Sequence, residues 1–131
     1  MIRADSKDAK FLTQFTNGEH VSASDTTPDK GGGNRGFRPH ELLEAAVASC
    51  MNMTLRMSAE KHFIPFSNVS VSVFLNRNAP ENPTFEYCVD FPEAFSKEQR
   101  QVLLSALERC PVRNTLSKPL GFKPYQQSRL A

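Results

Sequence analysis

The longest hydrophobic stretch of the chain covers residues 40–61, where apolar side chains occupy positions on most sides of a helical turn. Pro39 stands directly before it, and proline is common in the first turn of a helix. His62 and Pro65 follow it. The pattern therefore predicts a long helix over residues 40–61. A helix this apolar is expected to be buried rather than to lie on a surface.

Strict alternation of apolar and polar residues predicts two strands after this helix. Residues 67–76 alternate through three valines and give the clearest strand pattern in the chain. Residues 85–91 give the next strand, and the proline-containing turn at 78–83 would join the two as a hairpin. A period of two places Cys88 on the opposite face from the aromatic residues of the second strand.

A second hairpin is predicted near the N-terminus. Residues 9–16 and 19–25 have strand-like patterns, and they flank Asn17-Gly18. This dipeptide is a strong signal for a two-residue hairpin turn.

The loop over residues 25–38 contains three consecutive glycines, at 31–33. A loop of this length in a small domain is often functional. The glycines do not have the Gly-x-Gly-x-x-Gly spacing, and no Gly-Lys-Ser/Thr follows them. We therefore do not expect a phosphate or nucleotide site here.

The C-terminal third of the chain predicts a second helix. Residues 96–99 have the Ser-x-x-Gln form of a capping box, and an apolar stripe continues to about Arg109. Pro111 directly follows Cys110, so Cys110 can be the N-cap of a further short helix with proline at its first position. Residues 122–125 are expected to form a weak strand. Together the elements predict a single α+β domain over residues 1–131.

Composition and charge exclude several classes of function. The chain has 131 residues and a formal net charge of only +2, with its Lys and Arg scattered, so we expect no nucleic-acid partner. The sequence contains no run of 18 apolar residues, so we expect no membrane helix. The charged N-terminus does not resemble a secretory signal, and the expected location is cytoplasmic.

The chemistry of the chain centres on its three cysteines. An odd, low number does not indicate a disulfide framework. In a reducing compartment, a pair of cysteines is more often catalytic, redox-active or metal-binding than a permanent cross-link. The alternative is that all three are small buried hydrophobic residues.

The three thiols have different settings. Cys50 lies in mid-helix, where the helix dipole helps little, so it would need a cationic neighbour to become a thiolate. Cys110 is expected at a helix N-terminus, which favours a thiolate. Cys88 is expected to pack within its strand. Sixty positions separate Cys50 from Cys110, so spacing alone does not bring them together.

Two segments resemble a known family. The sequence RPHELLEAAVASCMNMTL at 38–55, followed by ERCPVRNTL at 108–116, is similar to the OsmC/Ohr superfamily of thiol-dependent peroxidases. The glycine-containing loop before the helix resembles that family too, so the likeness covers roughly residues 20–120. The motif Pro-x-Glu-Leu-Leu places the chain nearer a less characterised branch of the superfamily.

The resemblance implies a fold and a mechanism. The fold would have a long central helix and a second helix packed against curved antiparallel sheets, in an intertwined homodimer whose partner chain covers the apolar helix. Cys50 would attack an organic hydroperoxide and become a sulfenic acid. Cys110 would resolve it as a disulfide, which an external dithiol of lipoyl or thioredoxin type reduces. No metal ion and no organic cofactor are expected.

The helix start departs from the family pattern. In the Ohr and OsmC branches a glutamate directly follows the proline and orients an arginine. Here that position is His40, and Glu41 comes one residue later, which moves the carboxylate about 100° around the helix. The family arginine near the N-terminus has no match, and Arg35 and Arg38 are local substitutes. We take Arg38 as the candidate cation and Glu41 as its orienter.

Two other interpretations remain. A zinc site made from Cys50, Cys110 and His40 is disfavoured, because their spacing matches no ligand motif. A dimeric protein that binds an apolar or acyl ligand between its helices, with cysteines that only pack, is the main alternative to an enzyme.

Overall fold

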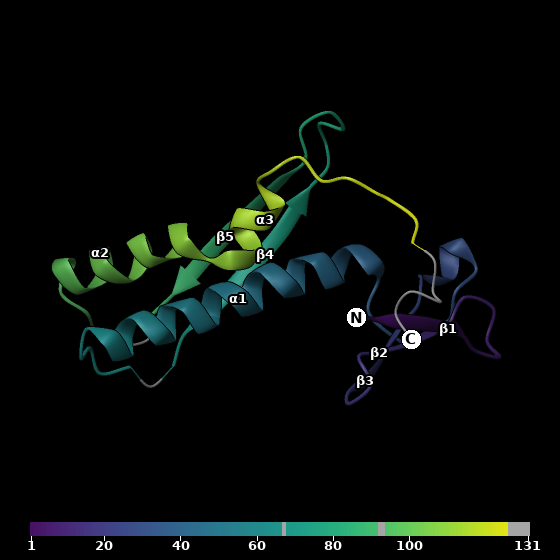
Figure 1. Ribbon diagram of the computed structural model, residues 1–131, viewed down its shortest axis with the longest axis horizontal. Coiled ribbons are helices and arrows are strands. Elements are labelled where there is room, and N and C mark those ends of the chain that lie inside the picture. Colours follow the sequence, from purple (N-terminus) through teal and green to yellow (C-terminus); the bar gives the residue numbers. More distant parts are fainter. Residues whose placement is uncertain (67, 92–93, 126–131) are drawn as a thin grey trace. The chain divides into compact units, whose positions relative to one another are not determined.

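The computed structural model describes residues 1–66, 68–91 and 94–125. They form two compact units. The first contains Met1–Ser49 and Val71–Asp90, and the second contains Cys50–Ser70 and the chain from Phe91 onward. The predicted long helix is confirmed as α1 (Pro39–Lys61), which Figure 1 shows as the longest helix. It supplies residues to both units. The prediction of one domain over 1–131 stays a prediction.

The N-terminal hairpin is confirmed in the first unit. Strands β1 (Arg3–Ser6), β2 (Thr13–Thr16) and β3 (Val21–Ser24) form an antiparallel sheet in that order. Asn17 Oδ1 accepts the backbone N–H groups of Glu19 and His20, at 2.9 and 2.8 Å, and Gly18 has a φ of 102°. The sequence did not predict β1, whose four residues are all exposed.

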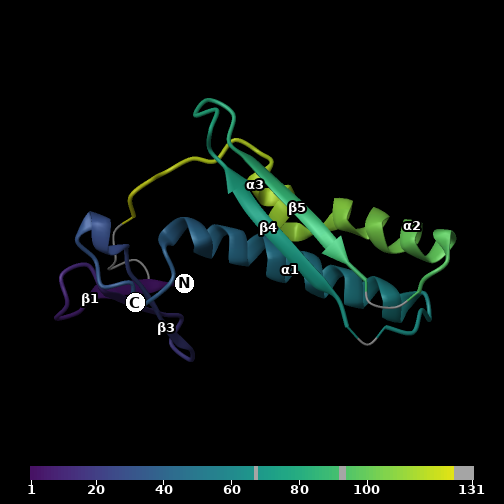
Figure 2. The same cartoon turned by 180° about the vertical axis from the view of Figure 1, so that it is seen from behind.

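The second predicted hairpin is also present in the first unit. Strands β4 (Ser70–Asn76) and β5 (Thr84–Asp90) pair in a two-stranded sheet and run in opposite directions (Figure 2). Val71, Val73 and Leu75 are half-buried, which confirms the alternation. Cys88 is exposed, so the expectation that it packs within its strand is wrong: it lies on the uncovered face of the hairpin.

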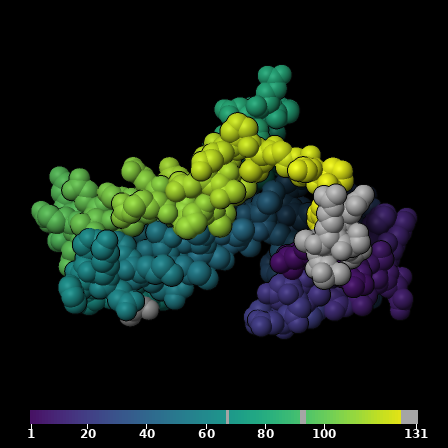
Figure 3. All heavy atoms as spheres, viewed as in Figure 1, coloured from purple at the N-terminus to yellow at the C-terminus, as the bar shows by residue number. Residues whose placement is uncertain are grey.

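The second unit is helical. Helix α2 (Lys97–Ala106) continues into the 3-10 turn η2 (Leu107–Arg109) and is followed by α3 (Pro111–Leu116). Figure 3 shows the atoms of α2 packed along the C-terminal half of α1. The core between them holds side chains that are at most 1% exposed, namely Met51, Leu55, Leu103 and Leu107.

Local signals explain where these helices begin and end. The capping box of α2 is confirmed, because Gln99 N–H donates to Ser96 Oγ at 3.1 Å and Ser96 N–H donates to Gln99 Oε1 at 3.0 Å.

Phe66, Phe91 and Phe95 form an aromatic cluster with ring centroids 5.4 to 6.2 Å apart. Aromatic pairs of this kind add stability beyond that of the apolar area they bury. The cluster joins the segment that precedes the hairpin to the segment that follows it.

Helix α1 is not buried on every side. Val47, Met51, Leu55 and Ala59, at a spacing of four, are at most 2% exposed. On another side Leu43, Met53 and Met57 are 41%, 49% and 67% exposed. The expectation of burial therefore holds for one face of the helix in the single chain.

Residues 122–125 form no strand, so that expectation is wrong, and the side chain of Phe122 is 99% exposed. The loop at 25–38 contains a short 3-10 turn, η1 (Pro28–Lys30). Among the described residues, no helix combines the length and the hydrophobicity needed to cross a bilayer.

Candidate functional site

The two motif cysteines lie together in the second unit. All three cysteines are free thiols, and the side chain of Cys110 forms a hydrogen bond with that of Cys50. Cys50 is half-buried on α1, beside the buried stripe that carries Met51. Cys110 is 0% exposed. Cys50 is therefore partly exposed to solvent, while Cys110 is fully shielded.

The local position of Cys110 is the predicted one. It is the N-cap residue of α3, with an extended backbone and Pro111 at the first helical position. Its N–H donates to the carbonyl of Leu107 at 3.2 Å, which ends η2. The short turn between α2 and α3 thus fixes the thiol against α1.

The expected charge state of Cys110 is wrong. Burial raises the pKa of the Cys110 thiol above its ordinary 9.0, and the hydrogen bond with Cys50 raises it further. The backbone N–H groups of Arg113 and Val112 act in the opposite direction and are outweighed, and no side-chain capping bond forms. Desolvation disfavours the charged form more than the short helix favours it. Cys110 therefore keeps its proton and acts as the donor to Cys50.

The candidate cation and its orienter also lie together, in the first unit at the start of α1. Glu41 Oε1 accepts the backbone N–H of Arg38 at 2.8 Å and its Nε–H at 3.3 Å. These two interactions hold the pKa of Glu41 below its usual range, and the backbone hydrogen bond has the larger effect. The side chains are 51% and 41% exposed, so the ion pair is screened by solvent. The carboxylate both caps the helix start and fixes the arginine.

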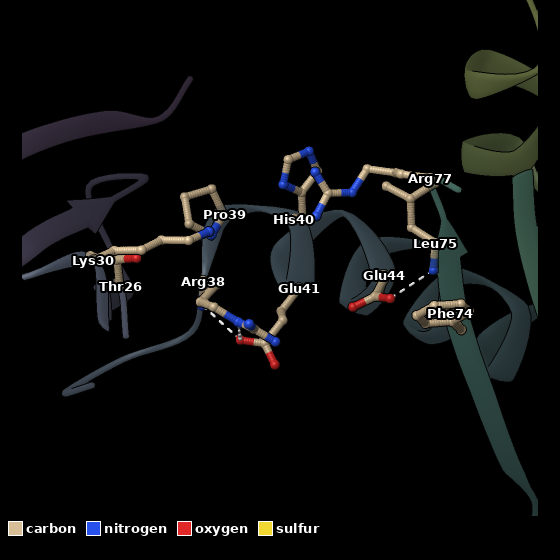
Figure 4. Close-up of a pocket in the computed structure, with 10 residues that line it drawn as sticks. All are labelled: Thr26, Lys30, Arg38, Pro39, His40, Glu41, Glu44, Phe74, Leu75 and Arg77. Atoms are coloured by element: carbon tan, nitrogen blue, oxygen red, sulfur yellow. Dashed lines mark hydrogen bonds and ion pairs between the residues drawn. The ribbon is translucent and has the colours of Figure 1, made fainter. Parts of the chain in front are cut away.

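A cavity of about 170 Å³ lies at this end of α1 (Figure 4). Glu44 lines it and accepts the backbone N–H of Leu75 in β4 at 2.7 Å. This bond ties the first turns of the helix to the hairpin, a role that the sequence did not reveal. His40 lines the same cavity and is exposed.

The loop before α1 is organised by one carboxylate that the sequence analysis missed. Asp25 is 3% exposed and accepts the backbone N–H groups of Thr26, Gly33 and Arg35 at 2.7, 3.2 and 3.1 Å. These hydrogen bonds lower the pKa of Asp25, and the one from the Arg35 backbone has the largest effect, followed by the one from Thr26. Its own N–H donates to the carbonyl of Phe37 at 3.0 Å, so the loop is closed just before Arg38.

Steric contacts explain two of the loop glycines. A Cβ atom on Gly32 would collide with the backbone of Thr26, and one on Gly36 would collide with the backbone of Ala23. The glycines therefore allow the loop strands to approach closely, which is a structural reason for their presence.

The comparison with protein families decides the identity of this arrangement. The family model described as OsmC-like protein matches residues 31–123, which include both cysteine motifs. The chain belongs to the OsmC-like protein family. No curated protein sequence matches it.

Solved structures of other OsmC-like proteins have the same fold. An OsmC-like protein of Mycoplasma pneumoniae is 20% identical, with a TM-score of 0.68 over 89% of this chain and 86% of that one. The organic hydroperoxide resistance protein OsmC of Legionella pneumophila is 19% identical, with a TM-score of 0.63 over 88% and 87%. Organic hydroperoxide resistance protein OhrB of Bacillus subtilis is 18% identical, with a TM-score of 0.60 over 88% of each chain.

Two other arginines of this OsmC-like protein, near the N-terminus, have local roles. Arg3 pairs with Asp5 at 3.1 Å on an exposed strand, and the backbone of Arg35 holds Asp25. Among the described residues, no three His, Cys, Asp or Glu side chains gather as a metal-ligating group. The chemistry that the arrangement offers is that of a pair of thiols, one on a partly exposed residue and one on a buried residue.

Proposed function

We propose that this OsmC-like protein is a cysteine-based peroxidase that reduces organic hydroperoxides. The observation that carries the proposal is the hydrogen-bonded pair of Cys50 and Cys110, in which Cys50 is partly exposed and Cys110 is buried and protonated. A peroxidase cycle that ends in an intramolecular disulfide needs a thiol that the peroxide can reach and a second thiol beside it. The relatives named for organic hydroperoxide resistance support the choice of substrate class.

The proposed cycle has three balanced steps. The Cys50 thiolate attacks the terminal peroxide oxygen, the O–O bond breaks, and the alkoxide leaves with a proton as an alcohol, so that Cys50 becomes a sulfenic acid. Cys110 then attacks the Cys50 sulfur, and the disulfide forms with loss of water. An external dithiol, of lipoyl or thioredoxin type, then attacks the disulfide to form a mixed disulfide, and its second thiol breaks that bond, so that both cysteines return to thiols and the reductant becomes a disulfide.

The pair of Arg38 and Glu41 is the proposed source of the cation that favours the Cys50 thiolate. A carboxylate that fixes a guanidinium lowers the cost of ordering that side chain, and a cation close to a thiol lowers its pKa. Within one chain Cys50 lies eleven residues after Pro39 on α1, about 17 Å along the helix axis, so the proposed role requires a second copy of the chain to bring Arg38 to the thiol. The hydrogen bonds between Arg38 and Glu41 support the proposal that the carboxylate orders the guanidinium.

The working form is proposed to be a homodimer. Helix α1 leaves apolar side chains open to solvent on one side, including Leu43, Met53 and Met57. Contiguous exposed apolar area usually marks an interface. A second copy of the chain would cover it.

The proposal is tested by intact-protein mass and thiol titration before and after one equivalent of cumene hydroperoxide. We expect the loss of two hydrogen atoms, a peptide that links Cys50 to Cys110, and an unchanged thiol at Cys88. The variant Cys88→Ser, which alters an exposed strand residue, should behave as the wild type. Three unreacted thiols would contradict the proposal and favour a protein that binds an apolar or acyl ligand.

A further inference from the structure

The cavity at the start of α1 carries more positive charge than the ion pair beside it uses. Its walls hold two carboxylates, those of Glu41 and Glu44, and three permanent cations, those of Lys30, Arg38 and Arg77. All of its described lining residues belong to the first unit, and none of them is a cysteine. The walls therefore have a net positive charge that the peroxidase cycle described above does not employ.

Both carboxylates of the walls already have partners. Glu41 Oε1 accepts the backbone N–H and the Nε–H of Arg38. Glu44 Oε2 accepts the backbone N–H of Leu75 at 2.7 Å. Figure 4 shows Glu41 beside Arg38 and Glu44 turned toward Leu75. The two acidic side chains are thus occupied in holding the helix start and the hairpin.

Three basic side chains of the cavity come from three separate segments. Lys30 ends the 3-10 turn η1, His40 lies in the first turn of α1, and Arg77 directly follows β4. Within the described chain neither Lys30 nor Arg77 forms an ion pair with a carboxylate. In the view of Figure 4 these two side chains extend toward the first turn of α1 from opposite sides. Three hydrogen-bond donors therefore line one space.

A cavity lined mainly by one sign of charge attracts ions of the other sign. Guanidinium and ammonium groups are common partners of phosphate oxygens, and an imidazole adds an N–H donor. A phosphate monoester has three peripheral oxygens, one for each donor, whereas a carboxylate has two. Phe74 lines the same cavity and is 58% exposed, so it offers an apolar face to the organic part of an ester.

The recognition would depend on side chains rather than on backbone N–H groups. Pro39 has no N–H, and that of Arg38 is bound by Glu41. No glycine is among the described lining residues. The cavity is therefore different from the glycine-rich phosphate loops against which the sequence argues.

We propose that this cavity binds a phosphate monoester, with the phosphate held by Lys30, His40 and Arg77 and the organic group against Phe74. Binding itself does not rest on the proposed peroxidase function, because no thiol takes part in it. Its consequence does rest on that function: an anion beside the proposed activating cation would offset its charge and lower the peroxidase rate.

Binding is tested with phenyl phosphate, inorganic phosphate and acetate, in NMR chemical-shift titrations of the full chain at pH 7 and constant ionic strength. The three donors are exposed, so we expect a dissociation constant of about 1 mM for phenyl phosphate. Inorganic phosphate should bind several-fold more weakly, and acetate more weakly still. Acetate binding as tight as that of phenyl phosphate, or shift changes centred outside the cavity, would overturn the proposal. Equal binding of the two phosphates would overturn the ester and leave a site for free phosphate.

Charge variants of opposite direction locate the site. Lys30→Gln and Arg77→Gln should each weaken phenyl phosphate by roughly fivefold. Glu44→Gln keeps an oxygen for the N–H of Leu75 and removes a negative charge from the wall, so it should tighten binding by about threefold. Lys7→Gln, at an exposed position of the same unit outside the cavity, is the matched control. An equal loss in the control, or unchanged affinity in Glu44→Gln, would overturn the assignment.

The consequence for activity is measured separately, from the turnover of cumene hydroperoxide at increasing phenyl phosphate. We expect turnover to fall at the concentration that half-fills the cavity, and Arg77→Gln to raise that concentration by the same fivefold. Full occupancy without inhibition would overturn this consequence and leave the binding site in place. If no peroxidase activity is found at all, the proposed function fails, whereas the titrations still decide the binding because they need no turnover.

Discussion

Two helix N-termini in this protein hold an ionisable side chain, and they treat it in opposite ways. At the start of α1, Glu41 accepts the backbone N–H of Arg38 at 2.8 Å, and its pKa is lowered. At the start of α3, the Cys110 sulfur faces the backbone N–H groups of Val112 and Arg113, and its pKa is raised. Backbone N–H groups therefore accompany a charged carboxylate at the start of α1 and a neutral thiol at the start of α3.

The difference is burial. The Glu41 side chain is 41% exposed, so water helps to stabilise its charge, whereas Cys110 is 0% exposed. Removal of a charge from water costs more than one short helical turn returns. The buried end therefore supplies a proton donor, and the exposed end supplies a fixed ion pair. The proposed order, in which Cys50 reacts before the buried and protonated Cys110, agrees with this contrast.

The largest effect is expected from Cys110→Ser, which removes the proton donor and the resolving thiol together. Steady-state turnover of cumene hydroperoxide should fall by roughly a thousandfold, the scale for a group that acts as part of a catalytic unit. After one equivalent of peroxide, the intact mass should show one added oxygen on Cys50 instead of a disulfide. Normal turnover in Cys110→Ser would contradict the two-cysteine cycle.

Burial around Cys110 can be disrupted without any change to a thiol. Leu107 is 1% exposed, and its carbonyl accepts the N–H of Cys110. Leu107→Ala should lower the free energy of unfolding by about 3 kcal/mol through lost burial and a cavity. Leu104→Ala, at a position 43% exposed in the same helix, should cost well below half of that. Urea unfolding of both variants makes the measurement, and equal losses would mean that the core does not lie where the structure has it.

A third ionisable group, the carboxylate of Asp25, tests whether hydrogen bonds can hold a charge in a nearly buried position. Its three backbone donors lower its pKa, so the ionised form stabilises the fold above the usual value of about 3.8 and this stabilisation is lost as the pH falls below it. Asp25→Asn should lower the Tm at pH 7, because its amide group can accept at only one atom. The Tm of the variant should also depend less on pH between 2.5 and 6, roughly the range over which carboxylates titrate.

The control for Asp25 is Asp8→Asn, at an exposed loop position. Its melting curves should follow those of the wild type across the same pH range. If Asp25→Asn does so too, the three hydrogen bonds contribute nothing to stability.

The sequence predicted the elements whose signals are local. The apolar run behind Pro39 is α1, Asn17-Gly18 is a hairpin turn, and Ser96 begins α2 through its capping box. It missed β1 because the residues RADS show no alternation and bury no side chain. A strand that is held only by backbone pairing leaves no hydrophobic pattern to find.

The site was less accessible to sequence reasoning, because it depends on burial. The position of Cys110 at a helix start was predicted correctly, but its charge state was not, since nothing in the sequence shows that the sulfur is 0% exposed. The closeness of Cys50 and Cys110 followed only from the family resemblance. The role of Asp25 depends on donors eight and ten residues away, which only the folded loop brings to it.

The smallest change in stability is expected from Glu41→Gln, at the exposed helix start. The glutamine oxygen can still accept the N–H of Arg38, and only the screened attraction to its guanidinium is lost. The Tm at pH 7 should fall by no more than about 2 °C, and less in high salt. Because the pKa of Glu41 is lowered, this difference should vanish as the pH falls below the ordinary value of 4.5.

Activity separates the two roles of this carboxylate. If Glu41 orients Arg38 for the Cys50 thiolate, Glu41→Gln should lower kcat/KM for a hydroperoxide by roughly tenfold, far more than its effect on stability implies. Glu60→Gln, at the exposed other end of α1, removes the same charge without this contact and should leave kcat/KM unchanged. An unchanged kcat/KM in both variants would reduce the ion pair to a helix cap and leave the activation of Cys50 to another cation.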